Sequence, residues 1–148
     1  MGIITIGKKK FQTEEKEMNQ QELFFYVDNP RVYSTLRENG NMNPSQQEIE
    51  TLMRKTENVK ELKVQIEQNG GLIEPLIVVF RNDNYIVLEG NSRLAAYRIL
   101  AESNPAKWSK VSVQVLPEDI TETEIFTLIG TYHLVKKKDW TVYEQAAY

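Results

Sequence analysis

The stretch that decides the fold is YIVLEGNSRLAA, residues 85–96. Its first four residues are apolar, and three of the four, Tyr, Ile and Val, are types enriched in strands, which is typical of a buried strand. The residues after position 93 are rich in Ala and Leu, which favours a helix. Gly90 stands between the two segments, so the sequence predicts a strand that turns sharply into a helix.

A strand–turn–helix of this kind is typical of an anion site. The amide N–H groups of the first helical turn have no intrahelical acceptor, and with the helix dipole they favour phosphate. Gly90 lets the backbone approach a ligand closely. Asn91 or Ser92 is expected as the N-cap or as a phosphate ligand, and Arg93 brings a fork of donors suited to phosphate. A plain capped helix with a surface arginine explains the same spacing.

Two helices are expected before this stretch. Ser45 with Glu48, and Asn58 with Glu61, have the spacing of capping boxes, and an apolar stripe at helical spacing follows each pair. The second stripe ends at residues 69–71, where glycine can take the left-handed conformation that closes a helix.

Strands are expected on both sides of these helices. The apolar run 76–80, the turn cluster 81–84 and the run 85–88 predict a β-hairpin. Residues 23–27 and 111–116 are further apolar runs and predict one strand each.

Helices are also expected at the C-terminal end. The capping pairs are Thr121 with Glu124 and Thr141 with Glu144. The first of these helices is predicted to run to about Leu134. The second is still running at Tyr148, so we expect the chain to be a fragment of a longer protein.

Composition excludes several classes of protein. The 148 residues contain no cysteine, which excludes disulfides, thiolate metal sites and cysteine nucleophiles. No apolar run approaches the roughly 20 residues that span a bilayer, and residues 1–10 have no signal core, so the cytoplasm is the expected location. A net charge of −3 argues against a DNA clamp that works by charge alone. The run Lys136, Lys137 and Lys138 is a candidate phosphate or DNA contact, but a solvated loop between two helices is the favoured explanation.

Three segments together resemble ParB-type domains. In residues 62–78 a helix ends in glycine and a strand follows Pro75, as in the first ParB box. Residues 89–96 resemble the second box, usually Gly-Glu-Arg-Arg followed by a helix of small residues. Residues 138–146 resemble the segment that opens the family's next helix. The three segments occur in the family's order over more than half of the chain.

The resemblance implies an α/β (α+β) fold of the ParB/sulfiredoxin type: a small mixed sheet flanked by helices, with trailing helices at the C-terminal end. It divides the chain into an N-terminal extension with a strand (1–44), a nucleotide-binding core (45–135) and the start of a following helical segment (136–148).

The resemblance also implies a nucleotide site for CTP or another nucleoside triphosphate with Mg²⁺. No metal-ligating residue is predicted in this chain. The implied phosphate and nucleoside contacts are Gly71, Glu74, Pro75, Gly90, Asn91, Ser92 and Arg93. In chromosome-partition members the nucleotide closes a clamp on DNA, and a separate helix-turn-helix reads the DNA site. That reader is absent from these residues, so DNA contact is expected through a full-length bacterial protein, with a homodimer left open.

The chain departs from the family pattern at three places. Arg93 is a single arginine where the family has two, and Glu74 replaces the usual glutamine before proline. Residues 133–137 replace a Glu-Asn-x-Gln-Arg segment that helps with metal and triphosphate. These departures leave the identity of the nucleotide and its hydrolysis open.

Two other classes of function remain as alternatives. An enzyme, either a nuclease or a phosphotransferase, would use Glu74, Glu89 or His133 as its catalytic groups. Capping or solvated acids and a histidine at a helix end explain the same residues. A non-catalytic interaction module with a vestigial pocket is the third alternative. The thiol chemistry of sulfiredoxins is excluded, because the chain has no cysteine.

Overall fold

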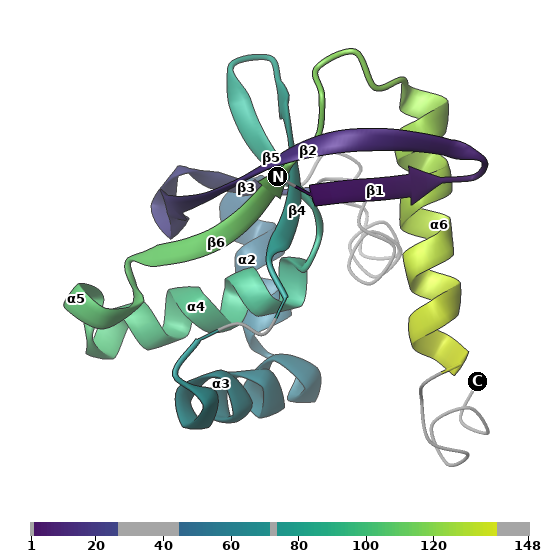
Figure 1. Ribbon diagram of the computed structural model, residues 1–148. Helices are drawn as coiled ribbons and strands as arrows, with labels where there is room; N and C mark the ends of the chain where they lie inside the picture. Colours follow the sequence, from purple (N-terminus) through teal and green to yellow (C-terminus); the bar gives the residue numbers. More distant parts are fainter. Residues whose placement is uncertain (1, 27–44, 72–73, 139–148) are drawn as a thin grey trace.

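A six-stranded mixed sheet forms the centre of the computed structural model, which describes residues 2–26, 45–71 and 74–138, with side chains up to residue 131 (Figure 1). The strand order is β1-β2-β6-β4-β5-β3. The strands are β1 (Gly2–Ile6), β2 (Lys9–Asn19), β3 (Leu23–Phe25), β4 (Leu76–Arg81), β5 (Asn84–Glu89) and β6 (Lys110–Val115). Neighbours are antiparallel except for the parallel pairs β3–β5 and β4–β6.

Helices cover both faces of this sheet (Figure 1). The helices are α2 (Gln46–Arg54), α3 (Glu57–Asn69), α4 (Asn91–Ser103), α5 (Pro105–Trp108) and α6 (Glu122–Lys138), and a short 3₁₀ turn, η1 (Gln20–Glu22), precedes β3. Helices α2 to α5 lie on one face and α6 lies on the other. The predicted α/β class, a mixed sheet flanked by helices, is confirmed.

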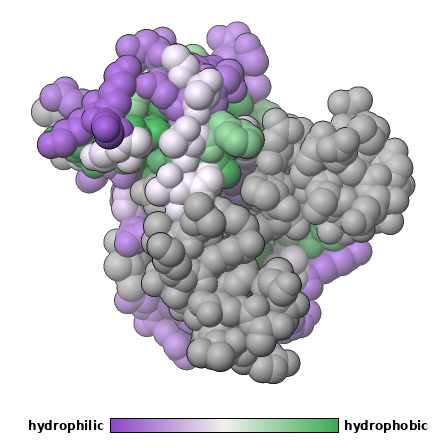
Figure 2. Space-filling view, turned by 90° about the vertical axis from the view of Figure 1, so that its right-hand side faces the viewer, coloured by the Kyte–Doolittle hydropathy of each residue, from purple (hydrophilic) through white to green (hydrophobic). Residues whose placement is uncertain are grey.

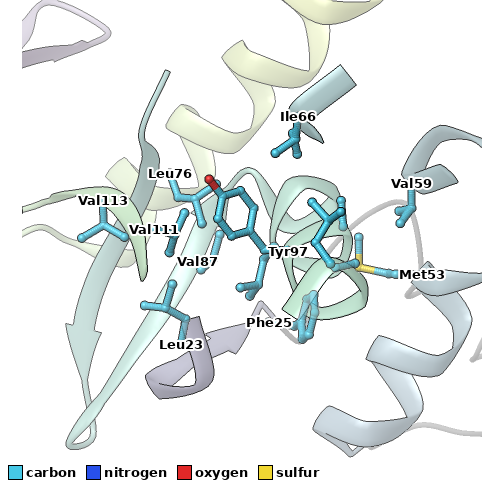
Figure 3. Packing of buried hydrophobic residues seen from close by; sticks show 14 of the residues in the cluster. Leu23, Phe25, Met53, Val59, Ile66, Leu76, Val87, Tyr97, Val111 and Val113 are labelled. Atoms are coloured by element: carbon cyan, nitrogen blue, oxygen red, sulfur yellow. The ribbon is translucent and has the colours of Figure 1, made fainter. Parts of the chain in front are cut away.

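Side-chain alternation along the strands divides the core into two layers. On β4, Leu76 and Val78 pack toward α2 to α5, while Ile77 and Val79 pack toward α6. Figure 3 shows the larger layer, in which Tyr97 of α4 lies among residues of the sheet and of α2 and α3. Both faces of the central strands are therefore buried, which explains the continuous apolar run of β4.

The caps of the first two long helices follow local sequence. Ser45 and Glu48 form the predicted capping box of α2. The predicted start of α3 is wrong: Thr56 is its N-cap, because the Thr56 hydroxyl accepts a hydrogen bond from the Val59 N–H at 3.2 Å. The predicted end is confirmed, with Gly70 left-handed at φ 80°.

The predicted hairpin is confirmed as β4 and β5. Its two turn residues, Asn82 and Asp83, both have positive φ, 52° and 64°. Two consecutive left-handed residues define a type I′ turn, which asparagine and aspartate tolerate well and whose twist matches that of the strands.

The N-terminal stretch contains more strands than expected. Only residues 23–27 were predicted to be extended there, and β3 confirms that strand, but β1 and β2 also form. The alternation of buried and exposed residues along β2 is weak, because only Phe11, Thr13 and Met18 of its eleven residues are buried. Because β2 pairs with β6, these strands continue the central sheet. The domain boundaries remain a prediction.

The helix predicted to end near Leu134 continues to Lys138 as α6. Its capping box of Thr121 with Glu124 is confirmed. The run Lys136–Lys138 was expected in a loop, and that expectation is wrong, because these residues form the last helical turn. The helix expected from Thr141 lies outside the described residues. Within the described ranges, no helix has the length and apolar character needed to cross a membrane.

Candidate functional site

The first turn of α4 begins at a glycine with no side-chain cap. Gly90 is the N-cap, with φ 101° and ψ 21°, and no side chain caps the helix there. The first main-chain bond runs from the Leu94 N–H to the Gly90 carbonyl at 2.9 Å. By helix geometry, the N–H groups of Asn91, Ser92 and Arg93 have no intrahelical acceptor, so the positive end of the dipole carries three donors.

Glycine is required at position 90 for two reasons. A Cβ there would lie 2.4 Å from Leu76 Cδ2 and 2.9 Å from Arg93 Nη2, which is too close for either atom. The positive φ of 101° is also strained for any residue with a Cβ. The turn thus brings the main chain close to the side chains of Leu76 and Arg93, and the predicted approach of a ligand to Gly90 stays a prediction.

Asn91 is a structural residue of the turn. Its side chain is buried, donates to the Val87 carbonyl at 2.8 Å and accepts from the Tyr26 N–H at 3.1 Å. The prediction that Asn91 or Ser92 caps α4 is wrong, because left-handed Gly90 takes the cap position. Asn91 instead ties β5 to the residue that follows β3, so its side chain serves the fold.

Arg93 folds back across the turn. Its Nη1 donates to the main-chain carbonyl of Glu74 at 2.8 Å, and its Nη2 lies 3.6 Å from Glu89 Oε1. The side chains of Arg93 and Glu89 are only 14% and 16% exposed. The structure therefore brings together four residues that the sequence named separately: Glu74, Glu89, Gly90 and Arg93.

The segment before β4 lies against α4. A Cβ at Gly71, whose φ is 151°, would lie 3.8 Å from the Tyr97 hydroxyl. Pro75 is half-buried and the Glu74 side chain is exposed, although the Glu74 carbonyl is held by Arg93. The predicted nucleoside side is thus next to the predicted phosphate side.

Comparison with known proteins finds similarity in structure. No protein-family model matches the chain, and no curated protein matches it in sequence. The ParB-N domain of a Pnob8-like ParB matches with a TM-score of 0.52 and 14% identity, over 84% of this chain and 38% of that one. The chain has the ParB/sulfiredoxin fold.

Two further solved structures match the chain at lower scores. The C-terminally truncated ParB of Caulobacter crescentus, complexed with CTP-γ-S, matches with a TM-score of 0.48 and 15% identity, over 78% of this chain and 50% of that one. Sulfiredoxin from Arabidopsis thaliana matches with a TM-score of 0.46 and 18% identity, over 78% of this chain and 97% of that one. The chain spans half or less of the length of the two ParB chains.

The remaining site residues that the sequence predicted are not joined to the turn by a described contact. His133, Lys136, Lys137 and Lys138 belong to α6, and their side chains lie outside the described set, so their roles remain predictions. In the ranges that the structure describes, no three His, Cys, Asp or Glu residues are grouped so as to hold a metal.

Arg98 is a supporting residue that sequence reasoning missed. Its guanidinium pairs with Glu50 at 2.7 Å and donates to the carbonyls of Gln20 at 3.1 Å and Leu23 at 2.7 Å. These bonds fix α4, and with it the turn, against α2 and β3. The partners lie 48 to 78 residues away in sequence, so no local signal reveals them.

Proposed function

We propose that this ParB-type domain binds a nucleoside triphosphate, with CTP the leading candidate, through phosphates held at the turn Gly90–Arg93. The observation that carries the proposal is the uncapped N-terminus of α4, where Gly90 provides no side-chain cap and Arg93 lies alongside. A phosphate is the ligand class that free helix N–H groups and a guanidinium fork both favour.

Each residue of the turn has a separate task in this proposal. The main-chain N–H groups of Asn91, Ser92 and Arg93 donate to phosphate oxygens, and left-handed Gly90 sets the backbone of the turn that carries them. The Arg93 guanidinium adds charge-assisted bonds, which are about twice as strong as neutral ones. Gly71, Glu74 and Pro75 line the nucleoside side.

Mg²⁺ enters this proposal as the counter-ion of the triphosphate. Mg²⁺ in nucleotide sites is commonly held by one or two carboxylates together with phosphate oxygens. Glu89 is the carboxylate beside the turn, but it faces Arg93 at 3.6 Å. We therefore propose no protein ligand for the metal.

The choice of CTP and the wider biology rest on the likeness of residues 62–96 to the ParB boxes. We propose that the domain works in the bacterial cytoplasm as the nucleotide switch of a longer, DNA-associated protein. DNA contact would then come from the full-length protein and would respond to the nucleotide.

A specific contact favours a second candidate, a non-catalytic interaction module. Glu89 places a negative charge beside Arg93. The Asn91 side chain is hydrogen-bonded to the Val87 carbonyl, within the fold. Both features weaken a phosphate site. In that case the fold is kept for contact with another macromolecule, and no nucleotide binds.

Thermal unfolding with CTP, ATP or GTP and Mg²⁺ separates the two candidates. A ligand at a hundred times its dissociation constant stabilises the native state by about 2.7 kcal/mol, which raises the melting temperature of a domain this size by several degrees. We expect a shift with CTP that is lost in Arg93→Ala and kept in Arg54→Ala, because the described ion-pair partners of Arg54, Glu50 and Glu102, lie outside the turn. No shift with any nucleotide would favour the interaction module.

A further inference from the structure

The two edges of the central sheet differ in how their main-chain groups are satisfied. At the β3 edge, the Phe25 N–H donates to the Gln46 side chain at 2.6 Å, and the Gln46 amide donates to the Phe25 carbonyl at 2.8 Å. The side-chain amide of Gln46 thus takes the place of a neighbouring strand. At the other edge, β2 is the one strand that pairs with β1 in the part of the chain that the structure describes.

The β1–β2 hairpin determines which groups of β1 face this second edge. Ile6 pairs with Lys9 across a two-residue turn, whose first residue, Gly7, has φ 62°. Residues that flank such a turn exchange hydrogen bonds, and bonded pairs then alternate along the two strands. The N–H and C=O groups of Ile3 and Thr5 therefore point away from β2, toward the open edge.

The sequence of β1 does not protect this edge. GIITI has no charged residue and no proline, and natural edge strands usually carry one or the other. The Ile3 side chain is 64% exposed, on the face opposite to the buried Ile4 and Ile6. Figure 2, which faces the end of the molecule with the β1–β2 turn and α6, shows hydrophobic surface next to hydrophilic surface in its upper part.

Positive charge lies beside one end of the edge. Lys8, Lys9 and Lys10, at the turn, are all exposed. Lys9 pairs with Glu124 of α6 at 3.4 Å, whereas neither Lys8 nor Lys10 has an ion-pair partner among the described side chains. Lys10 is the register partner of Thr5, so its side chain lies on the same face of the sheet as Thr5.

We propose that the β1 edge binds an extended, acidic segment of a partner protein as an added antiparallel strand. The main-chain groups of Ile3 and Thr5 bond to this strand, which is the usual source of affinity when a peptide extends a sheet. A carboxylate side chain of the segment lies opposite Thr5, and an apolar side chain lies opposite Ile3. Because the added strand runs antiparallel to β1, its sequence reads acidic residue, any residue, apolar residue.

The spacing of the strands allows Lys10 to reach the carboxylate. Lys10 lies on β2, so two strand spacings, about 10 Å, separate its backbone from that of the added strand. Thr5 lies between them and is short, so an extended lysine and an extended glutamate meet above it. The exposed acid Glu14 follows Thr13, which pairs with Gly2, and so lies past the opposite end of β1. The charges beside β1 therefore favour an acid at the turn end of the added strand.

Charge complementarity also distinguishes this occupant from a second copy of the chain. The β1 strand of a second copy has no carboxylate to place opposite Thr5, and its β3 edge is already occupied by Gln46. Pairing with either edge of a second copy would leave Lys10 without an acid. A partner strand that carries its own acid provides the missing charge.

Fluorescence anisotropy with a labelled synthetic peptide tests the proposal. The peptide Gly-Ser-Thr-Glu-Val-Ile-Thr-Ser-Gly has the required order, and we expect weak, saturable binding to the wild-type chain. Thr5→Pro removes an outward N–H at a position where an edge strand tolerates proline, and we expect it to abolish binding. Thr5→Ala keeps the N–H and is expected to bind as wild type does. Far-UV circular dichroism confirms that each variant is folded.

A charge swap tests the contact assigned to Lys10. Lys10→Glu places two carboxylates together above Thr5, and we expect the dissociation constant to rise roughly tenfold. A peptide with lysine in place of its glutamate should recover affinity for Lys10→Glu. Lys110→Glu is the matched control, because this exposed lysine pairs with Asn19, at the end of β2 that β1 does not cover, and should leave binding unchanged.

Four results would overturn the proposal. The first is the absence of saturable binding, and the second is binding that persists in Thr5→Pro. The third is stronger binding of a peptide in which Glu-Val-Ile is reversed to Ile-Val-Glu, which would contradict the antiparallel direction. The fourth is self-association of the wild-type chain in sedimentation equilibrium that Thr5→Pro abolishes, because a second copy would then occupy the edge.

Discussion

The Arg93 guanidinium donates to the main-chain carbonyl of Glu74 at 2.8 Å, which joins the start of α4 to the segment that leads into β4. The same guanidinium lies 3.6 Å from the Glu89 carboxylate, and both side chains are largely buried. Arg93 is therefore already engaged before any ligand arrives. A phosphate at the turn must share or replace these partners.

Replacing Glu89 by glutamine tests this competition. Glu89→Gln removes the negative charge next to Arg93 while keeping the size of the side chain, so we expect triphosphate affinity to rise about three- to tenfold. Isothermal titration calorimetry measures the change. Glu102→Gln is the control, since Glu102 pairs with Arg54 at the far end of α4 and should leave affinity unchanged. A fall in affinity in Glu89→Gln would mean that Glu89 contacts the nucleotide or its metal.

Gly90→Ala is expected to destabilise the domain. The added Cβ would lie 2.4 Å from Leu76 Cδ2, and φ 101° is strained for alanine, so we expect a loss of about 2–4 kcal/mol in the free energy of unfolding. Urea denaturation provides the value. Gly130→Ala is the matched control: it lies within α6, and among the described residues nothing outside the adjoining helix backbone lies within 4 Å of the new Cβ, so the change should be neutral or stabilise by up to about 1 kcal/mol. Equal effects at the two positions would argue against the described turn.

The features that could be predicted from the sequence are those that residues adjacent in the chain determine. The capping box of Ser45, the left-handed Gly70 and the turn at residues 82–83 are each decided by residues that lie next to one another in the chain. The strand–turn–helix around Gly90 was predicted for the same reason. Asn91 was misassigned as a cap because Gly90's own backbone conformation supplies the cap, and sequence does not reveal that choice.

Contacts between segments that are distant in the sequence could not be predicted from its pattern. Arg98 meets Glu50 across 48 residues, and Asn91 meets Tyr26 across 65. The strand β2 was missed because most of its residues are polar and exposed, so its alternation is visible only once its buried side is known. The fold class was therefore predictable, while the partners that hold the site in place were not.

Arg98→Ala is expected to loosen the support of the site. Arg98 and Glu50 are 17% and 23% exposed, so removal of the guanidinium leaves the mostly buried Glu50 carboxylate with only Arg54 at 3.5 Å and leaves two carbonyls without this donor. We expect a loss of about 2–4 kcal/mol in unfolding free energy, measured by urea denaturation. Arg54→Ala serves as the comparison and should cost no more than about 1 kcal/mol, because Arg54 is 35% exposed. Equal losses would contradict the role given to Arg98.

The cap of α6 gives stability a pH dependence. The Thr121 N–H donates to the Glu124 carboxylate at 2.9 Å, and this bond lowers the pKa of Glu124 from its usual value of 4.5. A lowered folded-state pKa contributes stability above about pH 4.5, and that contribution is lost as pH falls through the folded-state pKa. Wild type should therefore lose more stability than Glu124→Gln between pH 6 and pH 3. Parallel pH profiles would show that the cap bond contributes nothing.

The position of the bound phosphate is the central claim, and amide chemical shifts measure it most directly. ¹⁵N-labelled protein is titrated with CTP and Mg²⁺, and the amide signals are followed by two-dimensional NMR. We expect the largest shifts at Asn91, Ser92 and Arg93, whose N–H groups face the anion, and loss of these shifts in Arg93→Ala. Binding that shifts other amides and leaves these three unmoved, or no binding at all, would contradict the phosphate site.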